Sequence, residues 1–354
     1  MSKTTLIKEA IELLQALIAT PSVSREEDKS AALIMNFLQA KDIEVEQIKN
    51  NVWARSKNYD PQKKTLLLNS HHDTVKPAAG YTRNPYDPVI EDGRLYGLGS
   101  NDAGGALVSL ISTFVYFHEM ILPFNLVLLC SAEEEVSGTE GIALAIGHIP
   151  RPEVAIIGEP TSMDMAIAEK GLLVLDCLAH GKSGHAARDE GENALYKAID
   201  DINRLRSFRF DKVSELLGPV KMTTTMIEAG TQHNVVPDHC AFTVDVRTTD
   251  AYTNREILDI LQADLASEVT PRSLRLNPSK ITPDHPLVKA GLALGLKTYG
   301  SPTLSDQSLI DIPSLKLGPG DSRRSHTADE YIYVKQLEEG IETYINLLSN
   351  LKNI

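Results

Sequence analysis

Long apolar runs, cysteine and excess positive charge are all scarce in this chain of 354 residues. No run approaches the ~18 apolar residues of a membrane-spanning helix, so we expect no membrane span and no membrane partner. The net charge of −13 argues against a nucleic-acid-binding surface. It does not restrict the substrate, because a local basic pocket can form in an acidic protein.

The three cysteines, Cys130, Cys177 and Cys240, are far apart, and each falls in a strand-like run. This spacing fits buried free thiols better than a disulfide framework or a zinc knuckle. The N-terminal segment carries Glu9 and Glu12 within its apolar pattern, which indicates an amphipathic helix rather than a secretory signal. Together these features predict a cytoplasmic protein.

Length and composition are those of an ordinary globular protein with 42% hydrophobic and 23% charged residues. A chain of 354 residues is long for one hydrophobic core, so we expect two domains. From about Gly171 the pattern becomes strand, helix, two strands, helix and strand, which is the order of a ferredoxin-like unit. Its predicted strands are Leu172–Ala179, Met222–Ile227, Cys240–Arg247 and Leu274–Leu276, and its predicted helices are Ala194–Phe208 and Arg255–Leu265.

The stretch from Leu66 to Val75 predicts a buried strand that ends in polar residues. Its apolar part is followed by His71, His72 and Asp73, which are poor core residues but suitable metal-site residues. In an open α/β sheet, ligands collect beyond the carboxyl ends of the strands. Other apolar runs end similarly, before Glu133-Glu134-Glu135, before Glu159, and before Asp321 and His326. The repeated pattern predicts a metal site at one edge of the sheet.

Asp102 lies in a glycine-rich segment, residues 97–105, before an apolar helix that we expect to extend to about Met120. A dinucleotide-binding fingerprint would need a glycine where Asp102 stands, so we reject that interpretation. A helix N-cap would be the simplest role for this aspartate. The flanking glycines let the backbone approach closely and favour an acidic ligand instead.

Five residues are candidate metal ligands: His71, Asp102, Glu135, Glu159 and His326. A mixture of imidazole and carboxylate without thiolate suits zinc, with cobalt or manganese as possible substitutes. Five protein ligands exceed the need of one tetrahedral catalytic zinc ion. Two ions that share one bridging carboxylate would use all five, and two-metal sites of this kind serve hydrolases.

Eight motifs extend this hypothesis from about residue 70 to residue 330. In order, they are SHHDTV, GLGSNDAGG, SAEEEVSG, GEPTS, GKSGHAA, NVVP, DVR and GPGDSRRSHTADE. The ordered set resembles the zinc-dependent aminoacylase/metallopeptidase family, which includes acetylornithine deacetylase and succinyl-diaminopimelate desuccinylase. Pattern and resemblance together imply an α/β catalytic domain, residues 1–170 and 279–354, with a mixed, mostly parallel sheet flanked by helices. The inserted ferredoxin-like α+β domain, residues 171–278, would be a lid and dimerisation domain.

The resemblance assigns the five ligands to two metal ions. Asp102 would bridge both ions. His71 and Glu159 would complete one coordination set, and Glu135 and His326 would complete the other.

The resemblance also implies roles for five residues that are not ligands. Asp73 would orient the first imidazole. Glu134 would be the general base that takes a proton from water and later returns it to the leaving amine. His185 would reach the neighbouring subunit's site in a dimer and stabilise the tetrahedral oxyanion. Asn234 and Arg247 would hold the substrate's α-carboxylate.

Several neighbouring residues have simpler interpretations. We expect His72 to lie beside the metal site without contacting it, because the H-x-D spacing selects His71. Glu133 is interpreted as an acid outside the ligand set, although a shift by one position in this run of glutamates would exchange their roles. Ser24 followed by Glu27 predicts a capping box at the start of the second helix.

The sequence therefore predicts a dinuclear-zinc amidohydrolase that removes an N-acyl group, acetyl or succinyl, from a small amino acid. The expected substrate is an ornithine-type intermediate of arginine biosynthesis, and the expected assembly is a homodimer formed through the inserted domain. A dipeptidase, an aminopeptidase or a diaminopimelate desuccinylase of the same family is the alternative. From a different class, the alternative is a metal-degenerate paralogue that only binds amino acids.

Overall fold

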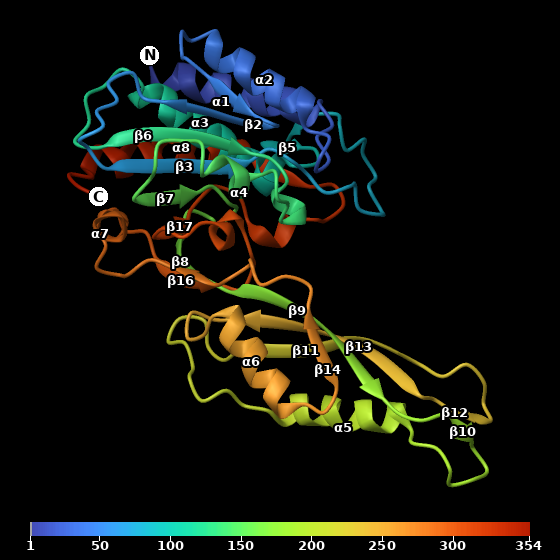
Figure 1. Cartoon of the computed structure of the whole chain (residues 1–354). Coiled ribbons are helices and arrows are strands. Elements are labelled where there is room, and N and C mark those ends of the chain that lie inside the picture. Colours follow the sequence, from blue (N-terminus) through green and yellow to red (C-terminus); the bar gives the residue numbers. More distant parts are fainter. Residues whose placement is uncertain (1) are drawn as a thin grey trace. The chain divides into compact units, whose positions relative to one another are not determined.

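In the computed structural model, which describes residues 2–354, the chain forms two compact units (Figure 1). The first unit extends to Ile167 and resumes at Lys280–Tyr299 and Ser305–Ile354; the second comprises Ala168–Ser279 and Gly300–Leu304. The insertion predicted from the sequence, residues 171–278, starts three residues after the second unit begins and stops one residue before its main segment ends. The additional segment 300–304 was not expected from the sequence pattern.

The first unit is built on a mixed sheet with strand order β1-β2-β6-β3-β7-β17-β8. The neighbours β6, β3, β7 and β17 are parallel, whereas the β1–β2, β2–β6 and β17–β8 pairs are antiparallel. The predicted mixed, mostly parallel sheet is confirmed. The strand bounds are β1 Glu46–Ile48, β2 Asn51–Arg55, β3 Thr65–His71, β6 Asn125–Ser131, β7 Val154–Ile157, β8 Met165–Glu169 and β17 Ser314–Lys316.

Strand alternation divides the core of the first unit between the two faces of this sheet. Leu66 and Leu68 belong to the larger cluster, with side chains of α1, α2, α3 and α8, whereas Leu67 packs with those of α4. All three leucines are fully buried, and each such burial contributes about 1.5–3 kcal/mol relative to exposure. The helices are α1 Lys3–Ile18, α2 Asp28–Gln39, α3 Gly105–Phe117, α4 Ile142–Ala145, α7 Pro286–Ala293 and α8 Val334–Asn350.

The second unit is a four-stranded antiparallel sheet with order β11-β13-β9-β14 and two helices. Buried side chains alternate along β9 and pack against α5 and α6, so the predicted ferredoxin-like arrangement is confirmed. Two short strands, β10 and β12, form a separate pair. The bounds are β9 Gly171–His180, β10 Gly184–His185, α5 Ala194–Ser207, β11 Lys221–Ala229, β12 Val235–Val236, β13 His239–Thr248, α6 Asn254–Asp264 and β14 Glu268–Pro271.

One predicted strand of this unit is wrong. The last strand is β14, Glu268–Pro271, and not the apolar stretch Leu274–Leu276. Leu276 is buried, but it lies in a loop. Its own carbonyl accepts the backbone N–H of Leu172 at 2.9 Å. Burial alone therefore produced the strand-like pattern.

The remaining strands are short, and three of them, β4, β5 and β18, form a small antiparallel sheet. The turn at Asp92-Gly93 joins β4 to β5, and both residues have the positive φ that such a turn requires (51° and 74°). All three cysteines are buried and free, as expected. Within residues 2–354, no helix has both the length and the hydropathy of a membrane span. The bounds are β4 Ile90–Glu91, β5 Arg94–Tyr96, β15 Ser279–Lys280, β16 Thr298–Ser301 and β18 Tyr331–Tyr333.

Candidate metal centre

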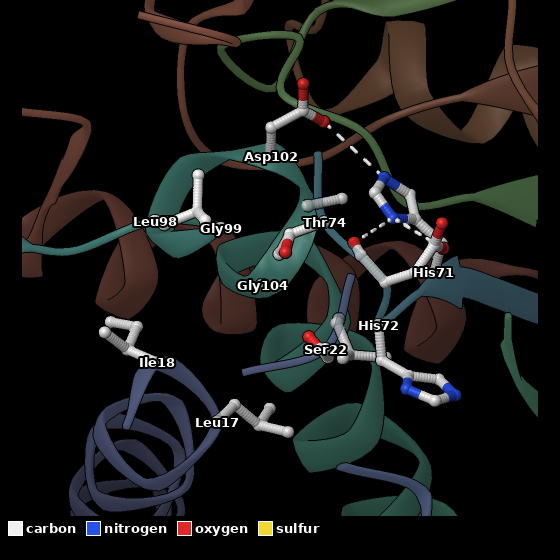
Figure 2. A pocket seen from close by; sticks show the side chains of 13 residues that line it. Leu17, Ile18, Ser22, His71, His72, Thr74, Leu98, Gly99, Asp102 and Gly104 are labelled. Atoms are coloured by element: carbon white, nitrogen blue, oxygen red, sulfur yellow. Dashed lines mark hydrogen bonds and ion pairs between the residues drawn. The ribbon is translucent and has the colours of Figure 1, made fainter. Parts of the chain in front are cut away.

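The two histidines at the end of β3 face opposite ways, as successive residues of a strand must. The Nε2 atom of His71 lies 3.5 Å from Oδ1 of Asp102. The ring of His72 instead contacts the Ser30 hydroxyl at 2.8 Å and the backbone carbonyl of Asn50 at 2.9 Å. Figure 2 shows the His71 ring turned toward Asp102 and the His72 ring turned away. Only His71 is therefore available to a metal ion.

Asp102 belongs to η1, an irregular single turn at Ser100–Gly104, and its carboxylate lies between two imidazoles. Its Oδ1 faces His71, and its Oδ2 lies 3.6 Å from Nε2 of His326. A carboxylate whose two oxygens point to different imidazoles has the geometry of a bridging ligand. Asp102 has non-helical backbone angles, and the N-cap of α3 is Gly104, so the simple capping role is excluded.

The run of three glutamates after β6 divides between the site and its surroundings. Oε2 of Glu134 lies 3.9 Å from Nε2 of His71, and Oε2 of Glu135 lies 3.0 Å from Nε2 of His326. Glu133 adopts a positive φ of 56°, and its carboxylate accepts the backbone N–H of Glu140 at 3.2 Å. Glu133 therefore fixes the following turn rather than facing the cluster.

Within the described residues, two groups of three side chains place their ligand atoms within 4.8 Å of one another. One group is His71, Glu134 and Glu159, and the other is His71, Asp102 and Glu135. His326 lies outside these triples but contacts Asp102 and Glu135. Imidazole and carboxylate donors at these separations fit divalent transition metals. The grouping itself does not distinguish Glu134 as a ligand from Glu134 as a base.

The charges of the cluster shift the pKa values of its members. Burial, with neighbouring carboxylates, raises the pKa of Glu159 to about 8 and that of Glu134 well above its usual range. The hydrogen bond to Glu135 raises the pKa of His326 to about 9. The metal-free site therefore holds protons at neutral pH, and bound cations would displace them.

Asp73 connects the first imidazole to the glutamate turn. Its Oδ1 lies 3.4 Å from Nδ1 of His71, and its two oxygens accept the backbone N–H groups of Glu134 and Glu135, both at 3.1 Å. It also accepts the Ser24 hydroxyl at 2.7 Å. The predicted capping box is therefore wrong, because this hydroxyl serves Asp73 and not the start of α2.

Charged residues that the sequence analysis left without a role lie close to the cluster. Asp306 and Lys316 are both 2% exposed, and their opposite charges act on the pKa of Glu159. Glu330 is also 2% exposed and accepts backbone N–H groups of the Asp102 turn. Glu330 ends the motif GPGDSRRSHTADE, which was the one available signal. Lys316 lies in an apolar run and Asp306 begins the short helix η3, Asp306–Leu309, so no local pattern marked them.

Two predicted substrate contacts of the second unit lie side by side. His185 pairs with Val235 across β10 and β12, and its Nδ1 accepts the backbone N–H of Ala187 at 3.1 Å. The carbonyl of Asn234 accepts the N–H of Ala186 at 3.0 Å. Both His185 and Asn234 are exposed.

Arg247 lies in the four-stranded sheet of the second unit, near the C-terminal end of β13. It pairs with Leu172, and its guanidinium donates two hydrogen bonds to Asp245 at 2.9 and 3.1 Å. The stretch of β13 from His239 to Arg247 spans roughly 26 Å at ~3.3 Å per residue. Asn234 lies beyond the His239 end, beside β12 (Figure 1). One carboxylate cannot contact Asn234 and Arg247 of the same chain.

Comparison with known proteins identifies a family and a relative in sequence. A family model described as Peptidase family M20/M25/M40 matches residues 67–350. The acetylornithine deacetylase of Shigella sonnei (strain Ss046) is 30% identical over 370 aligned residues, which cover 96% of both proteins.

Solved structures show the same fold at lower identity. Aminopeptidase PepT from Bacillus cereus ATCC 10987 is 18% identical with a TM-score of 0.76, and the match covers 99% of both chains. The Bacillus subtilis YXEP protein, described as a dinuclear metal binding peptidase, is 16% identical with a TM-score of 0.75. That match covers 99% of this chain and 100% of the other.

The position of Asp102 gives a prediction about metal content. Asp102→Ala should lose both ions, because in the predicted arrangement its carboxylate would serve both sets, whereas His326→Ala should mainly empty one site. Metal analysis by mass spectrometry after gel filtration measures ions per chain. His148→Ala, at an exposed histidine of the first unit, is the control that should retain both. Two ions per chain in the Asp102→Ala protein would contradict the bridging role.

Proposed function

Because the chain belongs to peptidase family M20/M25/M40, we propose that it is a metal-dependent amidohydrolase that removes an N-acyl group from a small amino acid. The observation that carries the proposal is the cluster of imidazoles and carboxylates around Asp102, with Glu134 beside it. We expect zinc to be the metal, with cobalt or manganese as substitutes. We also expect a cytoplasmic location, which the free cysteines support.

The chain's own residues would divide the work of amide hydrolysis. When bound, two divalent ions would lower the pKa of water and polarise the scissile carbonyl. Asp73 holds His71 in place through Nδ1, which leaves Nε2 directed at the cluster. Glu134 would take the proton of the attacking water and deliver it to the leaving amine. Burial, together with neighbouring acids, raises the pKa of Glu134 well above its usual range, which suits a group that must hold that proton between the two steps.

The 30% sequence identity to an acetylornithine deacetylase, over 96% of both chains, supports an N-acyl-ornithine type of substrate, as in arginine biosynthesis. The test is a panel of N-acetyl and N-succinyl derivatives of ornithine, lysine, citrulline and diaminopimelate, with dipeptides included, assayed for released amine. We expect the highest kcat/KM on an N-acyl-ornithine. Faster release from dipeptides would favour a peptidase, and no release from any member, with metal bound, would favour a non-catalytic paralogue.

The base role of Glu134 gives a second prediction. Glu134→Ala should keep its metal content and lower kcat by ~10²–10⁴-fold, because base catalysis contributes that much. Glu135→Ala is the matched comparison and should lose metal. If Glu134→Ala loses an ion and Glu135→Ala does not, the ligand and base assignments must be exchanged.

The second unit offers a surface suited to the proposed homodimer. β11 is an edge strand of its sheet, and Met226 and Ile227 on it are 63% and 51% exposed. On α5, Tyr196 and Ile199 are 66% and 41% exposed, one helical turn apart. Exposed apolar side chains along an open strand edge favour pairing with another copy.

The spacing within the second unit supports action across subunits. Arg247 lies near one end of β13, whereas the His185–Asn234 pair lies at β10 and β12, beyond the other end of that strand, so a substrate that uses both must draw them from different chains. We therefore propose that His185 and Asn234 serve the site of the partner subunit.

Mixing two inactive variants tests this proposal. His185→Ala and Glu134→Ala chains, each nearly inactive alone, should regain activity after subunit exchange. A random mixture would restore roughly a quarter of the sites, because half the dimers are hybrids with one intact site each. Native mass spectrometry verifies the exchange. No recovery despite exchange would mean that His185 acts within its own chain or only structurally.

A further inference from the structure

The turn that carries Asp102 depends on hydrogen bonds from outside its own helix. Within η1, Asp102 has φ −117° and ψ 101°, so the regular helical pattern is interrupted. Glu330 accepts the resulting backbone donors. Its Oε2 accepts the N–H of Gly99 at 3.0 Å, and its Oε1 accepts those of Asn101 at 2.8 Å and Asp102 at 2.9 Å.

Burial makes these three hydrogen bonds consequential. Glu330 is 2% exposed, so water cannot replace either the carboxylate or the N–H groups if one partner is removed. Gly97 adds a fourth link by donating its N–H to the Glu330 carbonyl at 3.0 Å. Glu330 therefore accepts four hydrogen bonds from the glycine-rich segment before α3, three through its carboxylate and one through its carbonyl.

The same short segment supplies a predicted ligand. His326 precedes Glu330 by four residues, and its Nε2 lies 3.6 Å from Oδ2 of Asp102. Residues 326–330 thus present one imidazole to the Asp102 carboxylate and, at the same time, fix the backbone from which that carboxylate extends.

We propose that Glu330 is a positioning residue that sets the direction of the Asp102 carboxylate between the two ligand groups. The inference rests on the proposed metal-dependent function. In the proposed site, Asp102 must present one carboxylate oxygen to each of the two groups of metal ligands. Its side chain has little freedom once the backbone N–H groups of Asp102 and Asn101 are both bonded to Oε1 of Glu330. Loss of these bonds would rotate the turn and weaken metal binding without removing any ligand.

The neighbouring acid provides a matched control. Asp329 also caps backbone N–H groups, but those of Thr82 (2.9 Å) and Arg83 (3.1 Å), which belong to another loop. Asp329→Asn and Glu330→Gln therefore make the same change from carboxyl to amide at adjacent positions, and only the second change affects the Asp102 turn. The amide of Glu330→Gln keeps the shape and replaces one accepting oxygen with a donor.

The experiment measures zinc affinity of the metal-free, full-length variants by competition with a chromogenic chelator, with thermal unfolding of the same samples. We expect Glu330→Gln to bind zinc ~10–100-fold more weakly than the unaltered chain, as for other residues that orient ligands. Asp329→Asn should bind zinc normally. If Glu330→Gln does not fold, Glu330→Asp, whose carboxylate stands one methylene short of the N–H groups, takes its place.

Each result decides the inference. Normal affinity in the Glu330 variant, or an equal loss in both variants, would show that the segment only needs to be folded and would overturn the positioning role. An unaltered chain that binds no zinc would overturn the proposed function together with this inference. Selective loss at Glu330, with unfolding temperatures matched between the two variants, is the outcome that supports it.

Discussion

Repulsion among buried carboxylates is the constraint on which the rest of this structure depends. Parallel strands that end at one edge bring several acids to one place, and each must be held against its neighbours. Three further buried acids fix the loops that carry the cluster, because their carboxylates accept hydrogen bonds from backbone N–H groups of those loops. Hydrogen bonds to charged groups each contribute about 1.5–3 kcal/mol. The Glu27 carboxylate accepts the backbone N–H of Glu133, and the Asp73 carboxylate accepts those of Glu134 and Glu135. The Glu330 carboxylate accepts the backbone N–H of Asp102 and those of its flanking residues.

The same repulsion couples the site to protons. The pKa of Glu159 rises from 4.5 to about 8 in the folded chain, mainly because of burial. A raised folded-state pKa means that this group's contribution to stability is present below 4.5 and is lost as the pH rises through about 8. Divalent cations would reverse that loss, because they favour the ionised form that burial disfavours. Cation binding to this cluster should therefore release protons and become stronger as the pH rises.

Sequence reasoning succeeded where chemistry follows a local pattern. The buried strand before His71 and the apolar runs before the glutamate turn and Glu159 were recognisable, because a strand and the residues beyond its end are adjacent in the chain. It failed where a side chain serves a distant segment. Ser24 looked like a cap but donates to Asp73, 49 residues away, and Glu330 was quoted within a motif without a role because its partners are 228 to 231 residues distant. No periodicity encodes such pairings.

The second unit shows why a contact predicted from motifs must also be consistent with the path of the strands between them. Two residues that motif order presents as a pair, Asn234 and Arg247, are only 13 positions apart in the sequence. Between them, however, the chain enters β13 and runs along nearly its whole length. An extended strand converts this short sequence interval into a separation larger than a small amino acid. One copy of the second unit therefore cannot bring both contacts to one small ligand, and a second copy of the unit becomes a requirement of the proposed site rather than an addition to it.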